Sequence, residues 1–456
     1  MEFYWEDYLS VYMFLALAFG LFSGFPVAFV VGGIGLAFGF IGAMVDYFSL
    51  IEFYNILPRV WGGAAANLVL VAIPCFIFMG TMLERSGVAN DLLDILEILL
   101  RRVPGGLALA VTVMGTIMAA TTGIIGASVV MMTLMALPTM LRQRYQKELA
   151  TGTLAASATL GILIPPSIML VIMADLLAIS VGNLFPGAIL PGLLLSTLYF
   201  AYILVVSSLK PQWAPSLSDD VGPDNAGEMM MMLLKGFLPP VFLITLVLGS
   251  IFAGWATPTE AAGVGGFGSL VLAVINRKLT WSVLKDVCER TALTTGMIFF
   301  IFMGATAFSY VFRSLGGEDI IIEFIEFLGF EAWGLLFVLM ATIFILGFFF
   351  DWIEITLIVL PVFTPIVELM DFGTHVEGRD IVYWFAILVA VNLQTSFLTP
   401  PFGFALFYLK GVAPNSVKIQ NIYRGIIPFV LLQVMGLVAV IIWPQIALWL
   451  PNLVLE

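Results

Sequence analysis

The sequence predicts an all-α polytopic membrane protein, and three observations support this fold class. Hydrophobic residues make up 61% of the chain and charged residues 11%, whereas a soluble domain usually carries about 25% charged residues. Apolar stretches of about 20 residues, the length that crosses roughly 30 Å of hydrocarbon, recur along the whole chain. The N-terminal segment MEFYWEDYLS lacks the positive region and cleavage site of a secretory signal. We therefore interpret the first apolar stretch as a retained span.

The apolar pattern divides into full crossings and hairpins. Residues 105–141 and 331–370 are each interrupted by polar or glycine-rich residues, so we expect two re-entrant hairpins whose tips are covered by protein. Residues 211–234 begin with Pro, Asp and Ser, which predicts a cytoplasmic linker between residues 1–210 and 235–456. Full crossings are expected at residues 8–23, 25–43, 61–83, 148–180, 184–209, 235–255, 257–276, 291–313, 381–411 and 427–449.

The distribution of positive charge supports this topology, because cytoplasmic loops collect Lys and Arg. Fifteen of the 18 Lys and Arg residues fall on one predicted side, and only Arg59, Arg313 and Arg379 fall on the other. If either hairpin were counted as a single crossing, every later loop would change sides and the positive charges would no longer collect on one side. The outer loops are acidic instead. Both termini are therefore predicted to lie outside.

Two halves of the chain carry the same motifs in the same order. VVGGIG at residues 30–35 recurs as GVGGFG at 263–268, and FIFMG at 76–80 recurs at 300–304. LIPPS at 163–167 then corresponds to LTPPF at 398–402. Each half contains an odd number of predicted crossings, so the second copy must be inverted relative to the first. Inverted repeats with a site between them are the architecture of many secondary transporters.

Four interrupted segments are expected to meet near the midplane of the membrane. They are the hairpin tips at residues 121–128 and 347–352 and the helix breaks at 161–167 and 394–401. A proline pair removes two backbone donors and disfavours helix just before it, so each break exposes carbonyl oxygens and starts a new half-helix. Half-helix N-termini suit a carboxylate, and carbonyls with Thr and Ser hydroxyls suit sodium. The alternative is that these residues only mark kinks or close helix packing.

Some individual residues have two open interpretations. Asp351 is predicted to lie inside the membrane, where a carboxylate is costly and usually functional. It either contacts an ion or caps the second arm of its hairpin, and the two roles can coexist. Phe350 either lines a substrate pocket or packs as an ordinary core residue. For Glu260 we favour the structural role of a capping-box acid three residues after Thr257.

The residues at these positions resemble the large membrane subunit of tripartite ATP-independent periplasmic (TRAP) transporters, the DctM-like family. The motifs that carry the resemblance are TLGILIPPS at 159–167, PGLL at 191–194, ATPTEAA at 256–262, the Asp351 hairpin and LTPPFG at 398–403. The resemblance spans residues 14 to 448. It implies an elevator-type transporter in the bacterial inner membrane, with periplasmic termini.

The resemblance also implies function and partners. We expect sodium-driven import of a small organic anion, often a carboxylate, delivered by a periplasmic binding protein. A small four-helix membrane subunit is expected as a separate chain, besides the lipid bilayer. The stretch ATTGIIGASVV at 120–130 is similar to the branch linked to 2-oxo acids. Carried to the matching positions, the substrate residues are Thr121, Thr122, Gly123, Ser128, Ser167, Phe350, Thr399 and Phe402. The sodium residues are Gly126, Thr159, Gly161, Asp351, Gln394, Thr395, Ser396 and Thr399.

Several other functions are less consistent with the sequence. The net charge of −12 gives no indication of a nucleic-acid partner. Cys75 and Cys288 form no CxxC pair, so we expect no transition metal. The resemblance implies sodium as the coupling ion and no organic cofactor. An anion/sodium symporter that works without a binding protein would show the same architecture. An intramembrane hydrolase could use Asp351, but the hairpins lack a second well-placed aspartate, a Ser/His pair or a zinc motif. We therefore expect no enzyme.

Overall fold

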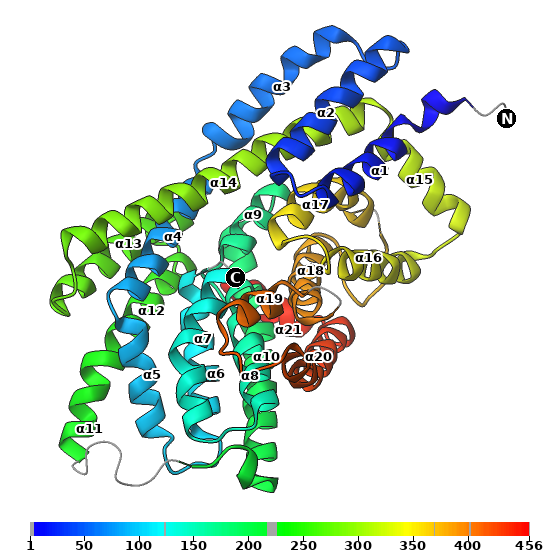
Figure 1. Ribbon diagram of the computed structural model, residues 1–456. Helices are drawn as coiled ribbons and strands as arrows, with labels where there is room; N and C mark the ends of the chain where they lie inside the picture. The colour runs from blue at the N-terminus through cyan, green and yellow to red at the C-terminus, as the bar shows by residue number, and fades with distance from the viewer. Residues whose placement is uncertain (1–3, 123–124, 217–225, 369, 401–402, 456) are drawn as a thin grey trace.

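The computed structural model describes residues 4–122, 125–216, 226–368, 370–400 and 403–455, and regular structure in these ranges is helical throughout (Figure 1). In the first half the helices are α1 (Leu9–Phe22), α2 (Val27–Met44), α3 (Phe53–Val60), α4 (Ala72–Arg85), α5 (Val88–Leu99), α6 (Gly106–Thr122), α7 (Ile125–Arg142), α8 (Lys147–Thr159), α9 (Ile168–Leu176) and α10 (Val181–Leu209). In the second half they are α11 (Ala226–Met232), α12 (Leu238–Phe252), α13 (Pro258–Ile275), α14 (Trp281–Ser314), α15 (Gly317–Leu328), α16 (Ala332–Leu346), α17 (Trp352–Glu368), α18 (Asp380–Leu398), α19 (Phe404–Val412), α20 (Ile419–Ile442) and α21 (Gln445–Leu455).

The predicted membrane class is confirmed by the lengths of the helices. Among the described residues, nine helices are long and apolar enough to span a membrane, or ten if one bent pair counts as a span. Three of the four arms of the expected hairpins contribute only shorter apolar helices, at Gly106–Met118, Ala332–Leu346 and Trp352–Thr364. Short arms of this kind agree with hairpins that enter and leave on one side.

The third crossing differs from the prediction. Instead of one continuous helix over 61–83, two helical segments, Leu50–Ala65 and Val69–Arg85, meet at an angle of 51°. Asn67 lies at the bend: its amide group donates to the carbonyl oxygen of Gly63 (3.3 Å), and its Oδ1 accepts from Val69 N–H (3.0 Å). A side chain that satisfies backbone groups in this way lets a helix break without leaving unpaired donors.

The two predicted broken helices lie at the centre of the molecule. The first consists of α8, a 3-10 turn η5 (Leu160–Ile162) and α9, and the second consists of α18 and α19. All residues in 149–174 and in 384–398 are buried. Their interruptions are tolerated because surrounding helices, rather than lipid, cover the exposed backbone.

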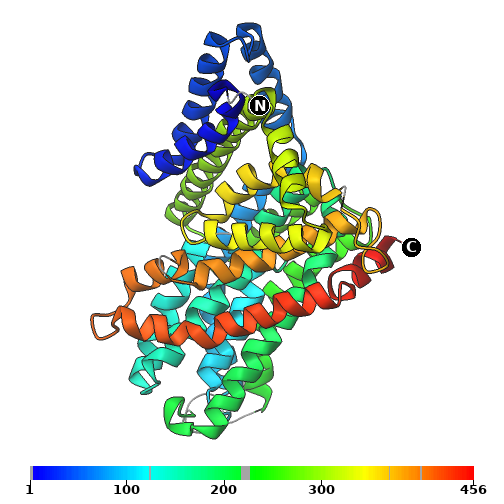
Figure 2. The ribbon, with the colours of Figure 1, turned by 90° about the vertical axis from the view of Figure 1, so that its right-hand side faces the viewer.

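The same helix pairings occur in both halves. Helix α2 packs against α14 as α4 packs against α13, and α8 packs against α20 as α10 packs against α18. The second arm of each hairpin also contacts the far half of the opposite broken helix, α7 with α19 and α17 with α9. Figure 1 shows α14 as a long helix along one side, and Figure 2 shows α20 crossing the central helices. This arrangement agrees with the repeat in the sequence.

The repeated glycine motifs explain two of these pairings. A Cβ atom on Gly32 would lie 3.3 Å from Cα of Gly304, and one on Gly304 would lie 2.7 Å from the carbonyl oxygen of Ala28. In the equivalent pair, a Cβ atom on Gly265 would lie 2.6 Å from Sδ of Met79. The glycine motif of each half therefore packs against the FIFMG motif of the other, because only glycine permits so close an approach of helices.

Candidate functional site

The two broken helices are joined by a hydrogen bond between equivalent positions. The side-chain amide of Gln394, in α18, donates to the carbonyl oxygen of Thr159, at the end of α8, over 2.8 Å. These residues are 235 positions apart, which is also the separation of Pro165 and Pro400 in the two proline pairs (400 − 165 = 235). Gln394 and Thr159 are both fully buried. The structure therefore brings the two predicted breaks together at the centre of the protein.

The hydroxyl groups around this junction have their protons engaged. Those of Thr395, Ser396 and Thr399 donate to carbonyl oxygens of α18 itself, over 3.2, 2.8 and 2.7 Å. The hydroxyl of Thr159 donates to the carbonyl oxygen of Ala156 over 2.9 Å. Each hydroxyl donates its hydrogen to a carbonyl oxygen of its own helix. The lone pairs of its oxygen can therefore accept a further hydrogen bond or coordinate a cation.

One buried acceptor at the junction lacks a partner. Among the described residues, the side-chain oxygen of Gln394 has no hydrogen-bond partner, although it is removed from solvent. An unsatisfied buried polar atom costs about 1–3 kcal/mol, so the site fits a group that this oxygen would bind. Neutral amide, hydroxyl and carbonyl oxygens are the ligands that sodium takes at broken helices in secondary transporters. The donor set thus suits a monovalent cation.

Each hairpin has a glycine that packs closely against the second broken helix. A Cβ atom on Gly347, at the second tip, would lie 2.0 Å from Oγ of Ser396. A Cβ atom on Gly126, beside the first tip, would lie 2.9 Å from the ring of Tyr408 in α19. Of the expected sodium residues, Ser396 therefore meets the second hairpin, and Gly126 of the first hairpin meets α19 of the second broken helix.

Asp351 acts as a helix cap in the structure. Its carboxylate accepts from Trp352 N–H (2.8 Å), and Glu354 Oε2 accepts from Asp351 N–H (3.0 Å). Together the two carboxylates satisfy backbone donors at the start of α17, where negative charge also suits the helix dipole. Thr257 and Glu260 likewise form the capping box that the sequence predicts at the start of α13.

The remaining expected residues lie at several places. Gly123 and Phe402 are outside the described residues, as are the side chains of Thr121 and Thr122, which end α6. Gly161 lies in η5 and Ser128 is buried in α7. Ser167 is fully buried and its hydroxyl bridges the break by donating to the carbonyl oxygen of Ile162. Phe350 packs near Phe22 of α1 and lines a small apolar cavity of about 90 Å³.

The structure adds polar residues that the sequence analysis did not select. Asn392, in α18, donates to the carbonyl oxygen of Met340 (2.7 Å), so it holds the first arm of the second hairpin. Asn67 donates to Asp175 Oδ1 (2.6 Å) at the end of α9. Isolated asparagines within apolar runs were the available signal for both. Tyr408 offered no comparable signal, because aromatic residues are frequent in this chain.

Two larger cavities are lined by residues of α14 and of one hairpin arm each. The Arg59 cavity, about 410 Å³, lies between α3, α9, α14 and α17 and is lined by Arg59, Arg313 and Asp175. The Arg85 cavity, about 550 Å³, lies beside α4 and α7 and is lined by Arg85, Arg290 and Ala127, among others. Arg290 and Arg313 are 23 residues apart in α14 (313 − 290 = 23), or about 35 Å along a helix. The cavities therefore approach the hairpins from opposite ends.

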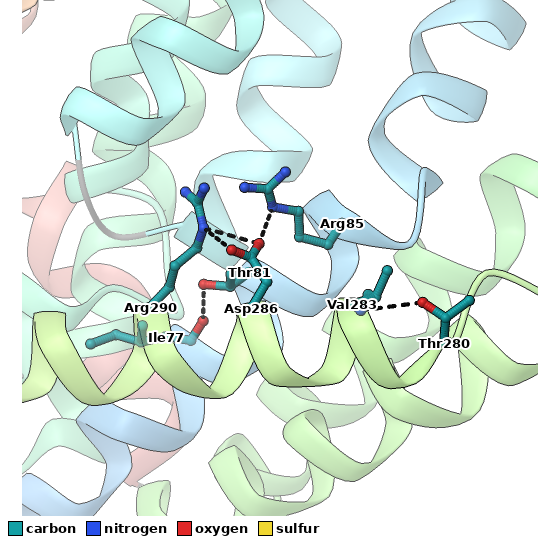
Figure 3. A network of polar contacts seen from close by, with 7 residues as sticks. All are labelled: Ile77, Thr81, Arg85, Thr280, Val283, Asp286 and Arg290. Carbon is teal, nitrogen blue, oxygen red and sulfur yellow. Dashed lines mark hydrogen bonds and ion pairs between the residues drawn. The ribbon is translucent and has the colours of Figure 1, made fainter.

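The Arg85 cavity contains a charged network. Arg85 and Arg290 share the carboxylate of Asp286, with N···O distances of 2.9 and 3.1 Å (Figure 3). Within the described residues, no group of three or more His, Cys, Asp or Glu side chains could hold a metal ion. The Arg85 cavity therefore lies beside paired charges, whereas the junction of Gln394 and Thr159 is built from neutral oxygens.

Comparison with known proteins gives one consistent family. The family described as tripartite ATP-independent periplasmic transporter, DctM component, matches residues 11–446. The C4-dicarboxylate TRAP transporter large permease protein DctM of Pseudomonas aeruginosa is 30% identical over 388 residues, covering 85% of this chain and 87% of that protein. The ectoine/5-hydroxyectoine permease protein UehC of Ruegeria pomeroyi is 28% identical over 448 residues, covering 98% and 99%.

Two further similarities extend the comparison. The 2,3-diketo-L-gulonate permease protein YiaN of Escherichia coli is 26% identical over 443 residues, covering 96% of this chain and 98% of that protein. Among solved structures, the YdaH transporter of Alcanivorax borkumensis aligns with a TM-score of 0.59 at 15% identity, covering 88% of this chain and 89% of that one. At that identity the likeness concerns the fold alone.

Proposed function

Because the chain belongs to the DctM family of large permease components of TRAP transporters, we propose that it imports a small organic anion in symport with sodium. In this family the large permease works with a small membrane subunit and a periplasmic binding protein. We propose that this chain uses both, the small subunit being a separate polypeptide. The protein is a transport permease and not an enzyme.

The observation that carries the sodium proposal is the junction of Gln394 and Thr159. It supplies a buried amide oxygen that has no partner in the described part of the chain, and hydroxyls that donate their protons to neighbouring carbonyl oxygens. A cation bound there would compensate the unsatisfied oxygen and would hold the two breaks together. Because each broken helix also contacts a hairpin, occupation of this site would stabilise the surfaces that bind the substrate. Sodium binding and substrate binding would then favour each other.

The proposed movement is that of an elevator. The hairpins α6–α7 and α16–α17 and the broken helices form the moving part, and helices including α2, α4, α13 and α14 form the scaffold. Few polar contacts between described residues link the two parts: Arg313 Nη2 donates to Pro361 O (2.9 Å), and Asn67 donates to Asp175 Oδ1 (2.6 Å). Contacts of this number could break and reform during transport. We further propose residues 1–210 and 235–456 as inverted halves joined by the cytoplasmic linker 211–234, with periplasmic termini in the inner membrane.

The proposed substrate class is a 2-oxo acid or a related monocarboxylate. Support comes from the first hairpin stretch, ATTGIIGASVV at 120–130, which resembles the branch of the family linked to 2-oxo acids. Relatives are named for C4-dicarboxylates, ectoines and a diketo sugar acid, so family membership alone does not choose among organic acids. An uptake screen that showed preference for a dicarboxylate or a sugar acid would remove this assignment.

The proposed function is tested by uptake of labelled pyruvate into proteoliposomes that contain this chain and its small subunit. The binding protein is added on the outside, and sodium, proton or potassium gradients are imposed in turn. We expect uptake only with both the binding protein and a sodium gradient. Sodium-driven uptake without the binding protein would instead indicate a simple anion/sodium symporter. Uptake of other organic acids but not of pyruvate would be consistent with the proposed transport mechanism but would reject the proposed substrate class.

A further inference from the structure

The Arg59 cavity is lined by two arginines, and the rule that places positive charge in cytoplasmic loops does not explain them. Arg59 and Arg313 are two of the three basic residues on the predicted outer side, the third being Arg379. Cytoplasmic loops favour Lys and Arg for reasons of membrane insertion, but that tendency opposes positive charge on the outer side. The surrounding outer loops are acidic. Two of three outer cations thus converge on one cavity, which indicates a role for their charge.

The side chain of Arg59 is held in place by an aromatic ring, and no carboxylate of a described residue pairs with its charge. Its guanidinium carbon lies 4.6 Å from the ring centroid of Tyr310, a cation–π contact. The hydroxyl of Tyr310 in turn accepts from Asn55 (3.0 Å) and donates to Glu52 (3.3 Å). Across the described part of the chain, Arg59 forms no salt bridge. The aromatic ring therefore orients a guanidinium whose N–H groups remain available to a ligand.

Arg313 links the cavity to the second hairpin. Its Nη2 donates to the carbonyl oxygen of Pro361 (2.9 Å), and its Nε lies 2.8 Å from Glu318 Oε1. The Pro361 carbonyl lacks its usual helical donor, because the residue four positions later is Pro365 and has no N–H. Arg313 satisfies this orphaned acceptor. It therefore ties α14 to α17 at the wall of the cavity.

The opposite wall carries one carboxylate that is already engaged. Asp175 Oδ1 accepts from Asn67 (2.6 Å), and Asp175 forms no salt bridge with a described residue. Hydroxyls of Thr306 and Ser309 complete the polar lining. A volume of about 410 Å³ falls in the range of small-molecule sites, roughly 300–1,000 Å³. Two guanidiniums, one carboxylate and several hydroxyls suit a small carboxylate ligand.

We propose that the Arg59 cavity is an outer carboxylate-binding site that receives the transported anion before it reaches the hairpin tips. Arg59 is the principal anchor, since its charge is unpaired and a guanidinium binds a carboxylate through two parallel hydrogen bonds. Arg313, which is paired with Glu318, holds the α17 wall of the cavity next to the moving part. The inference rests on the proposed function and names a further site on the path of that substrate. It is separate from the neutral junction of Gln394 and Thr159.

Transport kinetics provide the first test. In proteoliposomes with the small subunit, binding protein and a sodium gradient, Arg59→Gln is expected to raise the KM for pyruvate uptake about tenfold, with Vmax retained. Arg59→Lys keeps the charge and is expected to raise KM less. The matched control is Arg379→Gln, which removes the third outer arginine and should leave KM unchanged. Equal KM values for Arg59→Gln and the unchanged protein would overturn the proposal.

A second readout does not depend on transport. Phenylglyoxal modifies accessible arginines, and mass spectrometry of the purified chain with its small subunit measures modification at each position. We expect 10 mM pyruvate to slow modification of Arg59 several-fold but not that of Arg379, whereas equal chloride protects neither. Protection without sodium-driven uptake would uphold this site and refute the proposed function. Uptake without selective protection of Arg59 would uphold that function and refute the site.

Discussion

Gln394 donates its side-chain N–H to the carbonyl oxygen of Thr159 over 2.8 Å, and so connects the two broken helices. The oxygen of the same side chain is buried and accepts no hydrogen bond from a residue that the structure describes. Replacing Gln394 by Leu keeps most of the volume but removes both the donor and the acceptor. We expect at least a tenfold loss of uptake rate, because Thr159 loses a partner and sodium loses a ligand.

The control for this substitution is Gln420→Leu, which changes an exposed glutamine at the start of α20. Uptake rates and sodium activation curves are measured for both variants after their amounts in the membrane are matched. A Gln394→Leu protein with the activation curve of the unchanged protein would show that this oxygen does not coordinate sodium.

The hydroxyls of Thr399 and Ser396 should contribute to sodium affinity. Thr399→Val preserves shape while deleting an oxygen. Ser396→Ala is chosen instead of Val, since Oγ of Ser396 already fills the space beside Gly347. We expect each substitution to raise the sodium concentration for half-maximal uptake several-fold, because a lost ligand weakens binding. The control is Thr342→Val, whose hydroxyl makes the same kind of helical bond to Val338 (2.8 Å). Unchanged sodium activation in both junction variants would contradict their placement.

The contact between Gly347 and Ser396 should tolerate no added methyl group. In Gly347→Ala the new Cβ would lie 2.0 Å from Oγ and 2.6 Å from Cβ of Ser396, so the hairpin tip must move away from α18. We expect a lower Tm of the purified protein, corresponding to about 1–3 kcal/mol for overpacking. The double variant Gly347→Ala, Ser396→Gly removes both overlapping atoms and should recover most of the lost Tm. No recovery would indicate that glycine is needed at 347 for another reason.

Close packing of α2 on α14 should depend on Gly304. In Gly304→Ala the added Cβ would lie 2.7 Å from the carbonyl oxygen of Ala28, a backbone atom that cannot rotate away. We expect destabilisation of about 1–3 kcal/mol, measured as a fall in Tm. Gly33→Ala is the matched control, because nothing lies within 4 Å of its added Cβ and alanine favours helix. A similar fall in Tm for both variants would show that replacing any glycine of these helices destabilises the protein, and that the contact with Ala28 is not the cause.

Much of the fold could be predicted from local signals. The proline pairs beginning at Pro165 and Pro400 locate the two breaks, because proline removes backbone donors wherever it occurs in a helix. Asp351 as a possible cap, and Thr257 followed by Glu260, predict helix starts by capping chemistry alone. Each of these signals acts over a few residues, so no knowledge of distant partners is required.

The partners across the molecule could not be predicted in the same way. Gln394 was selected as a polar residue in a break, but its bond to Thr159 joins residues 235 positions apart. Asn67 was overlooked because an asparagine in an apolar run interrupts a helix only where its side chain bonds to backbone groups, and the sequence does not show whether those bonds form. Tyr408 meets Gly126, and the facing of these two residues depends on how α7 packs on α19.

The most direct test of the central claim is a parallel measurement of radioactive sodium and labelled pyruvate entering the same proteoliposomes. Liposomes contain this chain and its small subunit, and the binding protein is added outside. The account predicts that pyruvate and the binding protein together increase sodium entry, and that Gln394→Leu reduces both fluxes while Gln420→Leu reduces neither. Pyruvate uptake at an undiminished rate without accompanying sodium entry would contradict it.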